Sequence, residues 1–337
     1  MAAAATTPAQ KKSWWPLLWG LAAFLVLPQL PFFELMIPIG QPLMLLAPVI
    51  AVCSIVGWKL GGRAALAVIW LALSVWILLR PAGSPGTPYD QMARGWAVLL
   101  AASFGLVSLW STTSPFFARA LAAVGLATVV GFLIALTAPS GIARSQHAAG
   151  EEFTRRVSGT IDRIHQSMDT PEWKQLSEKM PALDTWNDES EAAMRVIPDH
   201  SASLLPALLA LESLAALALG WGIFQRLSPV KIGPPLSPLT EFRFNDQLVW
   251  AVAVGATLCL LPAFADGRNA GLNLLVFFGV LYLIRGLGVL AWIARGHYAV
   301  IVILSLIPQV CIMLGVLALA LGLGDTWLDL RRRARAS

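Results

Sequence analysis

Long, uninterrupted apolar runs recur along the whole chain, and they limit its possible folds more than any other feature. A helix needs about twenty mostly apolar residues to cross a bilayer. Nine runs come close to that length: 14–33, 41–58, 63–80, 95–112, 116–137, 202–225, 247–265, 270–294 and 298–322. Because the runs do not alternate with a period of two, we expect helices rather than the strands of a closed barrel.

The composition argues against a water-soluble protein of this size. Of the 337 residues, 57% are hydrophobic and only 13% are charged, whereas a soluble domain has about 25% charged residues. A bilayer removes the need for a charged surface, provided that backbone groups pair within helices. The sequence therefore predicts an all-α, polytopic transmembrane helix bundle with eight or nine spans.

Basic residues next to these runs indicate the orientation of the bundle. With nine helices and a cytoplasmic N-terminus, most basic loop residues fall inside, as the positive-inside rule requires: Lys11, Lys12, Lys59, Arg63, Arg226, Lys231, Arg243 and Arg295. The arginine-rich tail, 331–335, does not fit, because nine spans place it outside. Eight spans would bring it inside if the short run 247–265 is re-entrant, so both counts stay open and nine is preferred.

One polar segment, 138–201, interrupts the apolar runs, and its seven basic and eleven acidic residues favour the extracytoplasmic side. Its apolar residues recur at helical spacing on either side of Thr170-Pro171, which reads as a helix N-cap followed by proline: Phe153, Val157, Ile161, Ile164, Met168, then Trp173, Leu176, Met180 and Leu183. We expect two amphipathic helices that lie on the membrane surface or cap the bundle. The alternative is a solvated hairpin packed on its own loops.

The polar segment divides the chain into three parts. Residues 1–137 are expected to form an N-terminal bundle of about five spans. Residues 138–201 form the amphipathic extracytoplasmic segment, and 202–337 form a C-terminal bundle of three or four spans with a basic tail.

Ionisable residues inside the apolar runs are the candidates for a functional site, because a charge at a helix centre costs about 2.5–3.5 kcal/mol on insertion scales. Glu212 lies near the middle of the sixth run and Arg285 in the middle of the eighth. We expect them to be close in space, as an ion pair or as two walls of a polar cavity that Gln309 completes. Both a substrate or proton site and a buried pair that fixes helix register fit this placement.

Other polar residues near the runs have simpler interpretations. Glu34, between the first two runs, is interpreted as an interfacial carboxylate rather than a gate. Gln41, Asn273 and the pattern Gly286-Leu287-Gly288 are interpreted as helix-packing features.

The sequence contains no motif of a known reaction. The phosphate-binding pattern GxxxxGK[ST] and the hydrolase patterns HExxH and GxSxG are absent. The three cysteines (Cys53, Cys259 and Cys311) lie within apolar runs, and the four histidines are scattered. We therefore expect a non-enzymatic protein without cofactor or metal. Its net charge of +5 is assigned to cytoplasmic loops rather than to nucleic-acid binding.

Three motifs in the second half, FRFNDQLVW, LYLIRGLGVLAWIAR and GLGDTWLDLRRR, resemble the YybS-like family of uncharacterised bacterial membrane proteins. That family is distantly similar to the substrate-binding components of energy-coupling-factor vitamin transporters and to the rod-shape protein MreD. The resemblance implies a multi-pass protein of the bacterial inner membrane whose first six spans form a transporter-like bundle. It also implies an ATPase and a coupling membrane protein as partners. No vitamin-binding residue is recognisable.

Two functions follow as expectations. The first is a non-catalytic, substrate-binding component of a small-solute transporter, with its site around Glu212, Arg285 and Gln309. The second is a scaffold or assembly subunit of a larger membrane complex, with the polar segment and the basic tail as docking elements.

Overall fold

The computed structural model describes residues 13–80, 86–138, 140–180, 182–294 and 308–329, and the regular elements in these ranges are all helical. Within these ranges, six helices are long and apolar enough to cross a membrane: α3 (Pro42–Lys59), α5 (Pro88–Trp110), α6 (Phe116–Thr137), the second part of α9 (Ala182–Leu227), α11 (Arg268–Ile293) and α13 (Pro308–Leu328). The all-helical architecture expected from the sequence is therefore confirmed.

The count of eight or nine spans is not confirmed, because three predicted runs form shorter apolar helices: α1 (Trp15–Val26), α4 (Ala64–Leu79) and α10 (Val249–Leu260). Proline accounts for two of the shortened ends, since it cannot continue helical hydrogen bonding. Pro28 lies in the 3-10 turn η1 (Leu27–Gln29) after α1, and Pro262 begins η4 (Pro262–Gly267), which connects α10 to α11. Residues 298–307 of the last run, Lys11, Lys12, Arg295 and the tail 331–335 lie outside the described residues.

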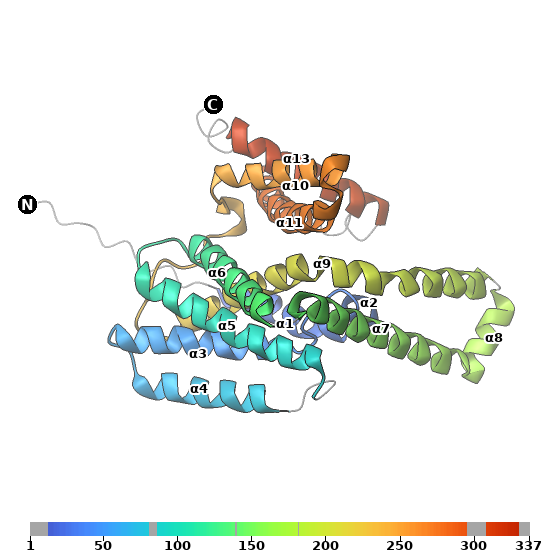
Figure 1. Ribbon diagram of the computed structural model, residues 1–337, viewed down its shortest axis with the longest axis horizontal. Coiled ribbons are helices and arrows are strands. Elements are labelled where there is room, and N and C mark those ends of the chain that lie inside the picture. The colour runs from blue at the N-terminus through green and yellow to red at the C-terminus, as the bar shows by residue number, and fades with distance from the viewer. Residues whose placement is uncertain (1–12, 81–85, 139, 181, 295–307, 330–337) are drawn as a thin grey trace, which may run out of the picture.

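Helix α3 lies at the centre of the bundle, and 72% of its residues are buried. It packs against α4, α5 and α9, and α4 and α5 flank it in Figure 1. Two glycines set the close approach of its neighbours. A Cβ on Gly105 of α5 would lie 2.7 Å from Val52 Cγ1, and one on Gly220 of α9 would lie 2.5 Å from Val49 Cγ1.

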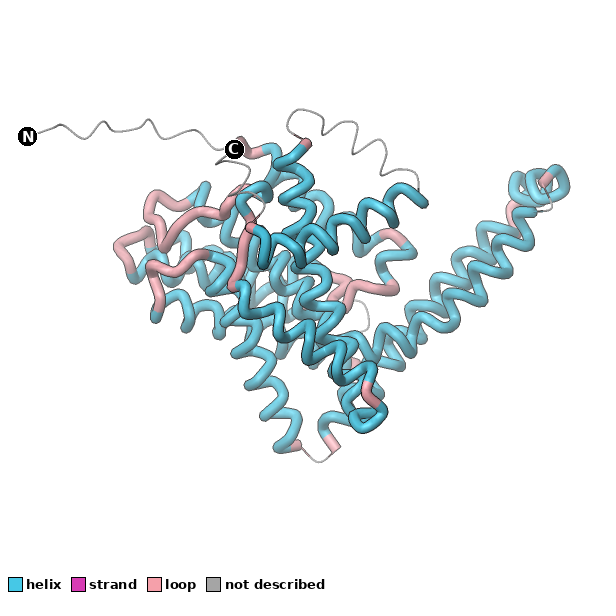
Figure 2. The backbone as a smooth tube through the Cα atoms, turned by 90° about the horizontal axis from the view of Figure 1, so that it is seen from above, coloured by secondary structure: helices cyan, strands magenta, loops and turns pink. Residues whose placement is uncertain are grey.

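The polar segment forms a helical hairpin that projects from the bundle (Figures 1 and 2). Helix α7 (Gly141–Met168) runs outward, α8 (Pro171–Lys179) turns the chain at the far end, and the first part of α9 returns. Helix α9 has 46 residues and continues from the hairpin into the bundle. The boundary drawn at residue 201 therefore falls within one helix.

The predicted apolar stripe of α7 is confirmed, because Phe153, Val157 and Ile161 are all buried. The predicted cap of α8 is also present, since the Thr170 hydroxyl accepts the N–H of Trp173 at 3.4 Å. The outer half of the hairpin points away from the bundle (Figure 2), so the expected cap across the bundle is wrong for that half, whereas its placement on the membrane surface stays a prediction. Helix α9 continues without a break from this half into the bundle, and α7 packs against it, so the hairpin packs on itself.

The outer half of the hairpin is joined by hydrogen bonds between side chains. The His165 ring lies 3.0 Å from Glu191, and Arg195 donates to the same carboxylate at 2.6 Å. Hydrogen bonds from Arg195 and then from His165 lower the pKa of Glu191 below its ordinary value. Glu191 therefore stays charged in moderately acidic solution.

Helices α10, α11 and α13 form a second group beside the bundle (Figure 1). The packing role expected of Gly286 is confirmed, because a Cβ there would overlap the carbonyl oxygen of Ala318 in α13. Asn273 of α11 joins this group to α9. Its amide donates to the carbonyl of Ser203 at 2.8 Å and accepts the N–H of Ala207 at 2.9 Å.

Candidate functional site

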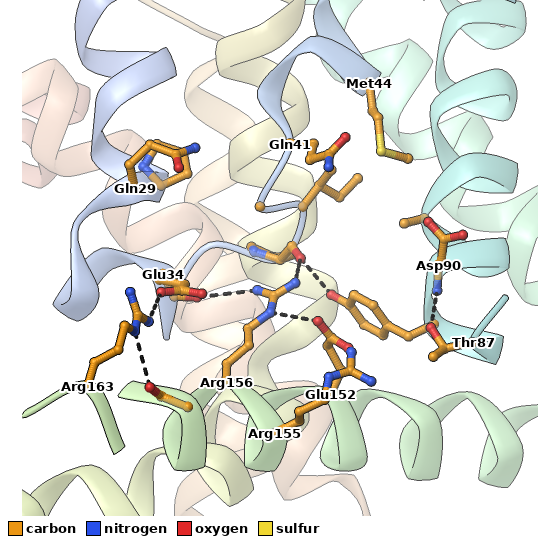
Figure 3. Close-up of a pocket in the computed structure, with 17 residues that line it drawn as sticks. Gln29, Glu34, Gln41, Met44, Thr87, Asp90, Glu152, Arg155, Arg156 and Arg163 are labelled. Atoms are coloured by element: carbon orange, nitrogen blue, oxygen red, sulfur yellow. Dashed lines mark hydrogen bonds and ion pairs between the residues drawn. The ribbon is translucent and has the colours of Figure 1, made fainter. Parts of the chain in front are cut away.

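A cavity of about 450 Å³ opens at the base of the hairpin, where α7 meets the bundle (Figure 3). We call it the basal cavity. Its walls come from the chain between α1 and α3, which includes α2 (Pro31–Glu34), from the first turns of α5, and from one face of α7. Its charged lining residues are Glu34, Asp90, Glu152, Arg155, Arg156 and Arg163.

One wall of the basal cavity is non-helical backbone, residues 35–41. This segment enters the protein interior, since Leu35 is 0% and Ile39 is 3% exposed. Buried peptide groups without a hydrogen-bond partner cost several kcal/mol in apolar surroundings, about 2–7 kcal/mol each. The surrounding helices therefore have to supply partners for this backbone.

Arg156 of α7 supplies several of these partners (Figure 3). Its guanidinium donates to the carbonyls of Ile37 at 2.7 Å, Pro38 at 3.0 Å and Glu34 at 3.3 Å. It also donates to the Glu152 carboxylate at 2.9 Å. With its donors used in this way, Arg156 holds the wall of the cavity in place.

Three other side chains complete the support of the segment. The Tyr89 hydroxyl of α5 donates to the Pro38 carbonyl at 2.8 Å, and the Ser201 hydroxyl of α9 donates to the Leu35 carbonyl at 3.1 Å. The N–H of Ile39 donates to Glu212 of α9 at 2.9 Å. Side chains from α5, α7 and α9 thus fix the irregular segment that shapes the cavity.

The remaining charges of the cavity are paired but accessible. Arg163 donates to Glu34 at 2.6 Å, and Arg155 forms an ion pair with Glu152. The Arg163 side chain is 53% and the Arg155 side chain 47% exposed. These two guanidinium groups can exchange a protein carboxylate for a solute without leaving a buried charge unpaired. The ion pair of Glu34 is compatible with the interfacial carboxylate expected there.

The sequence reasoning missed the arginines of α7. A signal was present, because Glu152, Arg156, Gly159 and Arg163 are spaced by four, three and four residues beside the apolar stripe. That spacing places them on one face of a helix. The sequence analysis considered only the apolar stripe of this helix, because nothing in the sequence indicated that residues 35–41 pack against the charged face.

The expected ion pair between Glu212 and Arg285 is wrong. Glu212 accepts from Ile39 near the basal cavity, whereas Arg285 bonds two aspartates in the C-terminal group of helices. The reason is that each charged side chain bonds a group outside the apolar runs: Glu212 bonds Ile39, and Arg285 bonds Asp246 and Asp325. Gln309 is exposed at the beginning of α13 and joins neither residue. A direct role of Glu212, Arg285 and Gln309 in binding a substrate remains a prediction.

Arg285 lies at the centre of a second charge cluster that links α10, α11 and α13. It is 1% exposed and donates to Asp325 of α13 at 3.0 Å and to Asp246, just before α10, at 2.6 Å. Arg243 forms ion pairs with Asp329 and, at 3.8 Å, with Asp325. The hydrogen bond from Arg243 to Asp329 raises the pKa of the Arg243 guanidinium. This cluster brings together the three C-terminal motifs FRFNDQLVW, LYLIRGLGVLAWIAR and GLGDTWLDLRRR.

Comparison with known proteins gives one family. No curated protein and no solved structure matches the chain. The family model described as a predicted membrane protein (DUF2232) matches residues 97–326, which is more than half of the chain and includes α7 and Arg285 with its partners Asp246 and Asp325. The protein therefore belongs to the DUF2232 family of predicted membrane proteins.

Proposed function

We propose that this membrane protein is the non-catalytic, substrate-binding component of a small-solute transporter, and that the solute binds in the basal cavity. The observation that carries the proposal is the cavity itself. Its volume of about 450 Å³ lies within the usual range of small-molecule sites, about 300–1,000 Å³. Its lining combines six charged residues with apolar surface from Ile39, Met44 and Ala93.

The balance of charge favours a zwitterionic solute. The lining holds three arginines and three carboxylates, so the cavity attracts neither sign of ion over the other. The exposed guanidinium groups of Arg155 and Arg163 would receive an anionic group of the solute. Glu34 and Asp90 would receive a cationic group, while Met44 would contact an apolar side chain.

The resemblance of the C-terminal motifs to the YybS-like family, and through it to the substrate-binding components of energy-coupling-factor transporters, supports this reading. It implies that a separate ATPase and a coupling membrane protein drive transport. We also infer an orientation in the bacterial inner membrane with a cytoplasmic N-terminus and the hairpin outside. The basal cavity would then face the side from which a solute is taken up.

The test is ligand binding by the full-length protein in mild detergent. Native mass spectrometry would identify a retained small molecule, and thermal unfolding would be measured with a panel of amino acids and other zwitterions. A ligand at a hundred times its Kd stabilises the folded state by about 2.7 kcal/mol. We expect Arg155→Gln combined with Arg163→Gln to abolish that stabilisation.

The matched control is Arg144→Gln, which changes an exposed arginine of the same helix that is not part of the cavity lining. It should respond to ligand as the unchanged protein does. Failure of the retained molecule and of the whole panel to stabilise the protein would overturn the proposal. So would a ligand response that survives in the Arg155→Gln, Arg163→Gln variant.

The projecting hairpin supports the second candidate function, a scaffold subunit of a larger membrane complex. Apolar side chains such as Met180 and Val196 are each 53% exposed on it. Replacing residues 166–190 with a short glycine–serine linker removes the tip and leaves the basal cavity. Loss of co-purifying membrane proteins with retained solute binding would favour the scaffold function, whereas an unchanged set of partners would exclude the tip as a docking element.

A further inference from the structure

A second large cavity, of about 970 Å³, lies at the end of the bundle opposite the hairpin. Its walls are the beginning of α1, the last turns of α9 and the segment 231–239. Figure 1 shows α9 running from the hairpin toward this opposite end. We call this cavity the basic crevice, because its only charged lining residues among those the structure describes are Arg226 and Lys231.

Neither cation of the basic crevice is neutralised by a carboxylate within the described ranges. Arg226 donates to the carbonyls of Gly222 at 3.0 Å and Ser13 at 3.2 Å, and its Nε is buried without a partner. Lys231 donates to the carbonyl of Ser228 at 3.1 Å and to that of Gln225. Carbonyl oxygens orient the two cations but leave two positive charges for an anion to neutralise.

Three tryptophans beside the crevice indicate its depth in the membrane. Trp14 lies under the Arg226 guanidinium, with 5.5 Å between the group and the ring centroid, and Trp15 and Trp19 are 68% and 70% exposed. Exposed indole rings at a helix end favour the headgroup region of a bilayer. Beyond the two cations the lining is mostly apolar and includes Leu17, Leu219 and Leu236.

From these observations we infer that the basic crevice binds one anionic phospholipid. The phosphate lies between Arg226 and Lys231, and an acyl chain follows the leucine-lined wall into the bilayer. Basic cavities at the end of transmembrane helices are suited to such headgroups. A free phosphate ion shares the headgroup chemistry, but it makes no use of the apolar wall.

The test is native mass spectrometry of the full-length protein with added phosphatidylglycerol or phosphatidylcholine of identical acyl chains. Both lipids carry a phosphate, but only phosphatidylglycerol has a net negative charge. We expect retention of phosphatidylglycerol in clear preference to phosphatidylcholine. Arg226→Gln with Lys231→Gln should lower the affinity about 30-fold, which is about fivefold for each cation.

The control is Lys59→Gln with Arg63→Gln, which removes the same charge from exposed positions near the α3–α4 turn. Lys231→Gln alone, at an exposed side chain, guards against a folding defect at Arg226 and should cost about fivefold. Equal losses in the crevice variant and the control would overturn the inference. If millimolar inorganic phosphate displaces the lipid and binds equally well on its own, the crevice is a phosphate site and the inference is overturned. These outcomes are independent of solute binding in the basal cavity.

Discussion

Removing the Arg285 guanidinium tests whether the second charge cluster stabilises the C-terminal group of helices. Arg285 and Asp325 are both buried, with side-chain exposures of 1% and 0%. The change Arg285→Met keeps most of the side-chain volume but leaves the Asp325 carboxylate without its closest cation. Among the described residues, Arg243 remains near that carboxylate, at 3.8 Å and 43% exposed.

The magnitudes follow from burial and from the partners that remain. Breaking a buried ion pair by removing one partner costs about 3–5 kcal/mol, because a buried charge is left behind. We expect Arg285→Met to cost about 3 kcal/mol, since Arg243 offsets part of the loss. Asp325→Leu leaves Arg285 bonded to Asp246 at 2.6 Å, so we expect about 2 kcal/mol. Asp246→Asn should cost about 1 kcal/mol or less, because Asp246 is 58% exposed.

The double variant Arg285→Met, Asp325→Leu tests whether the two side chains act as a pair. Replacing a whole buried ion pair with apolar side chains is often neutral. We expect it to be more stable than Arg285→Met alone, with a coupling energy of about 2–4 kcal/mol. The assay is reversible unfolding in mixed detergent micelles, followed by tryptophan fluorescence. If the two single changes add within about 0.5 kcal/mol, the buried pair is not the interaction that stabilises this helix group.

Three further predictions concern packing, helix pairing and pH. Gly286→Ala should destabilise the protein by about 1–3 kcal/mol, because the added methyl group pushes α11 away from α13. Gly279→Ala is the control, since a Cβ there meets nothing within 4 Å, and it should change stability by no more than about 1 kcal/mol. Thermal unfolding compares the two variants. Asn273→Ala should cost about 1–3 kcal/mol, because two backbone groups of α9 lose a partner, and faster hydrogen exchange at residues 203–207 would report it. The lowered pKa of Glu191 makes its stabilisation of the hairpin complete above the ordinary value of 4.5 and lost as the pH falls through the lowered pKa. The protection factors of the hairpin amides, which are corrected for the intrinsic exchange rate at each pH, should therefore fall from about pH 6 to about pH 3 less in Glu191→Gln than in the unchanged protein.

The apolar runs predicted the helices well because helix formation in a bilayer depends on the length and hydropathy of one continuous segment. The stripe Phe153, Val157 and Ile161 was equally visible, since it depends on helical spacing alone. Helix ends were predicted less well. Pro28 and Pro262 shorten their helices by a local backbone effect that a hydropathy average does not contain. The direction of the hairpin was not predictable, because it depends on α9 continuing as one helix past Pro198 and Pro206.

The partners of the buried charges could not be predicted from the sequence, for a different reason. Glu212 and Arg285 were expected to meet because each is a lone charge in an apolar run, and a buried charge needs a partner. Hydropathy identifies that need but gives no information on segments outside the runs. Glu212 meets the backbone of Ile39 in an irregular segment, and Arg285 meets Asp246 in a connection between helices. A lone charge within a run therefore indicates that some polar group from elsewhere enters the bundle at that depth. In this protein, the group that meets Glu212 belongs to the wall of the basal cavity, so Glu212 pointed to the neighbourhood of the candidate site although its expected partner was wrong.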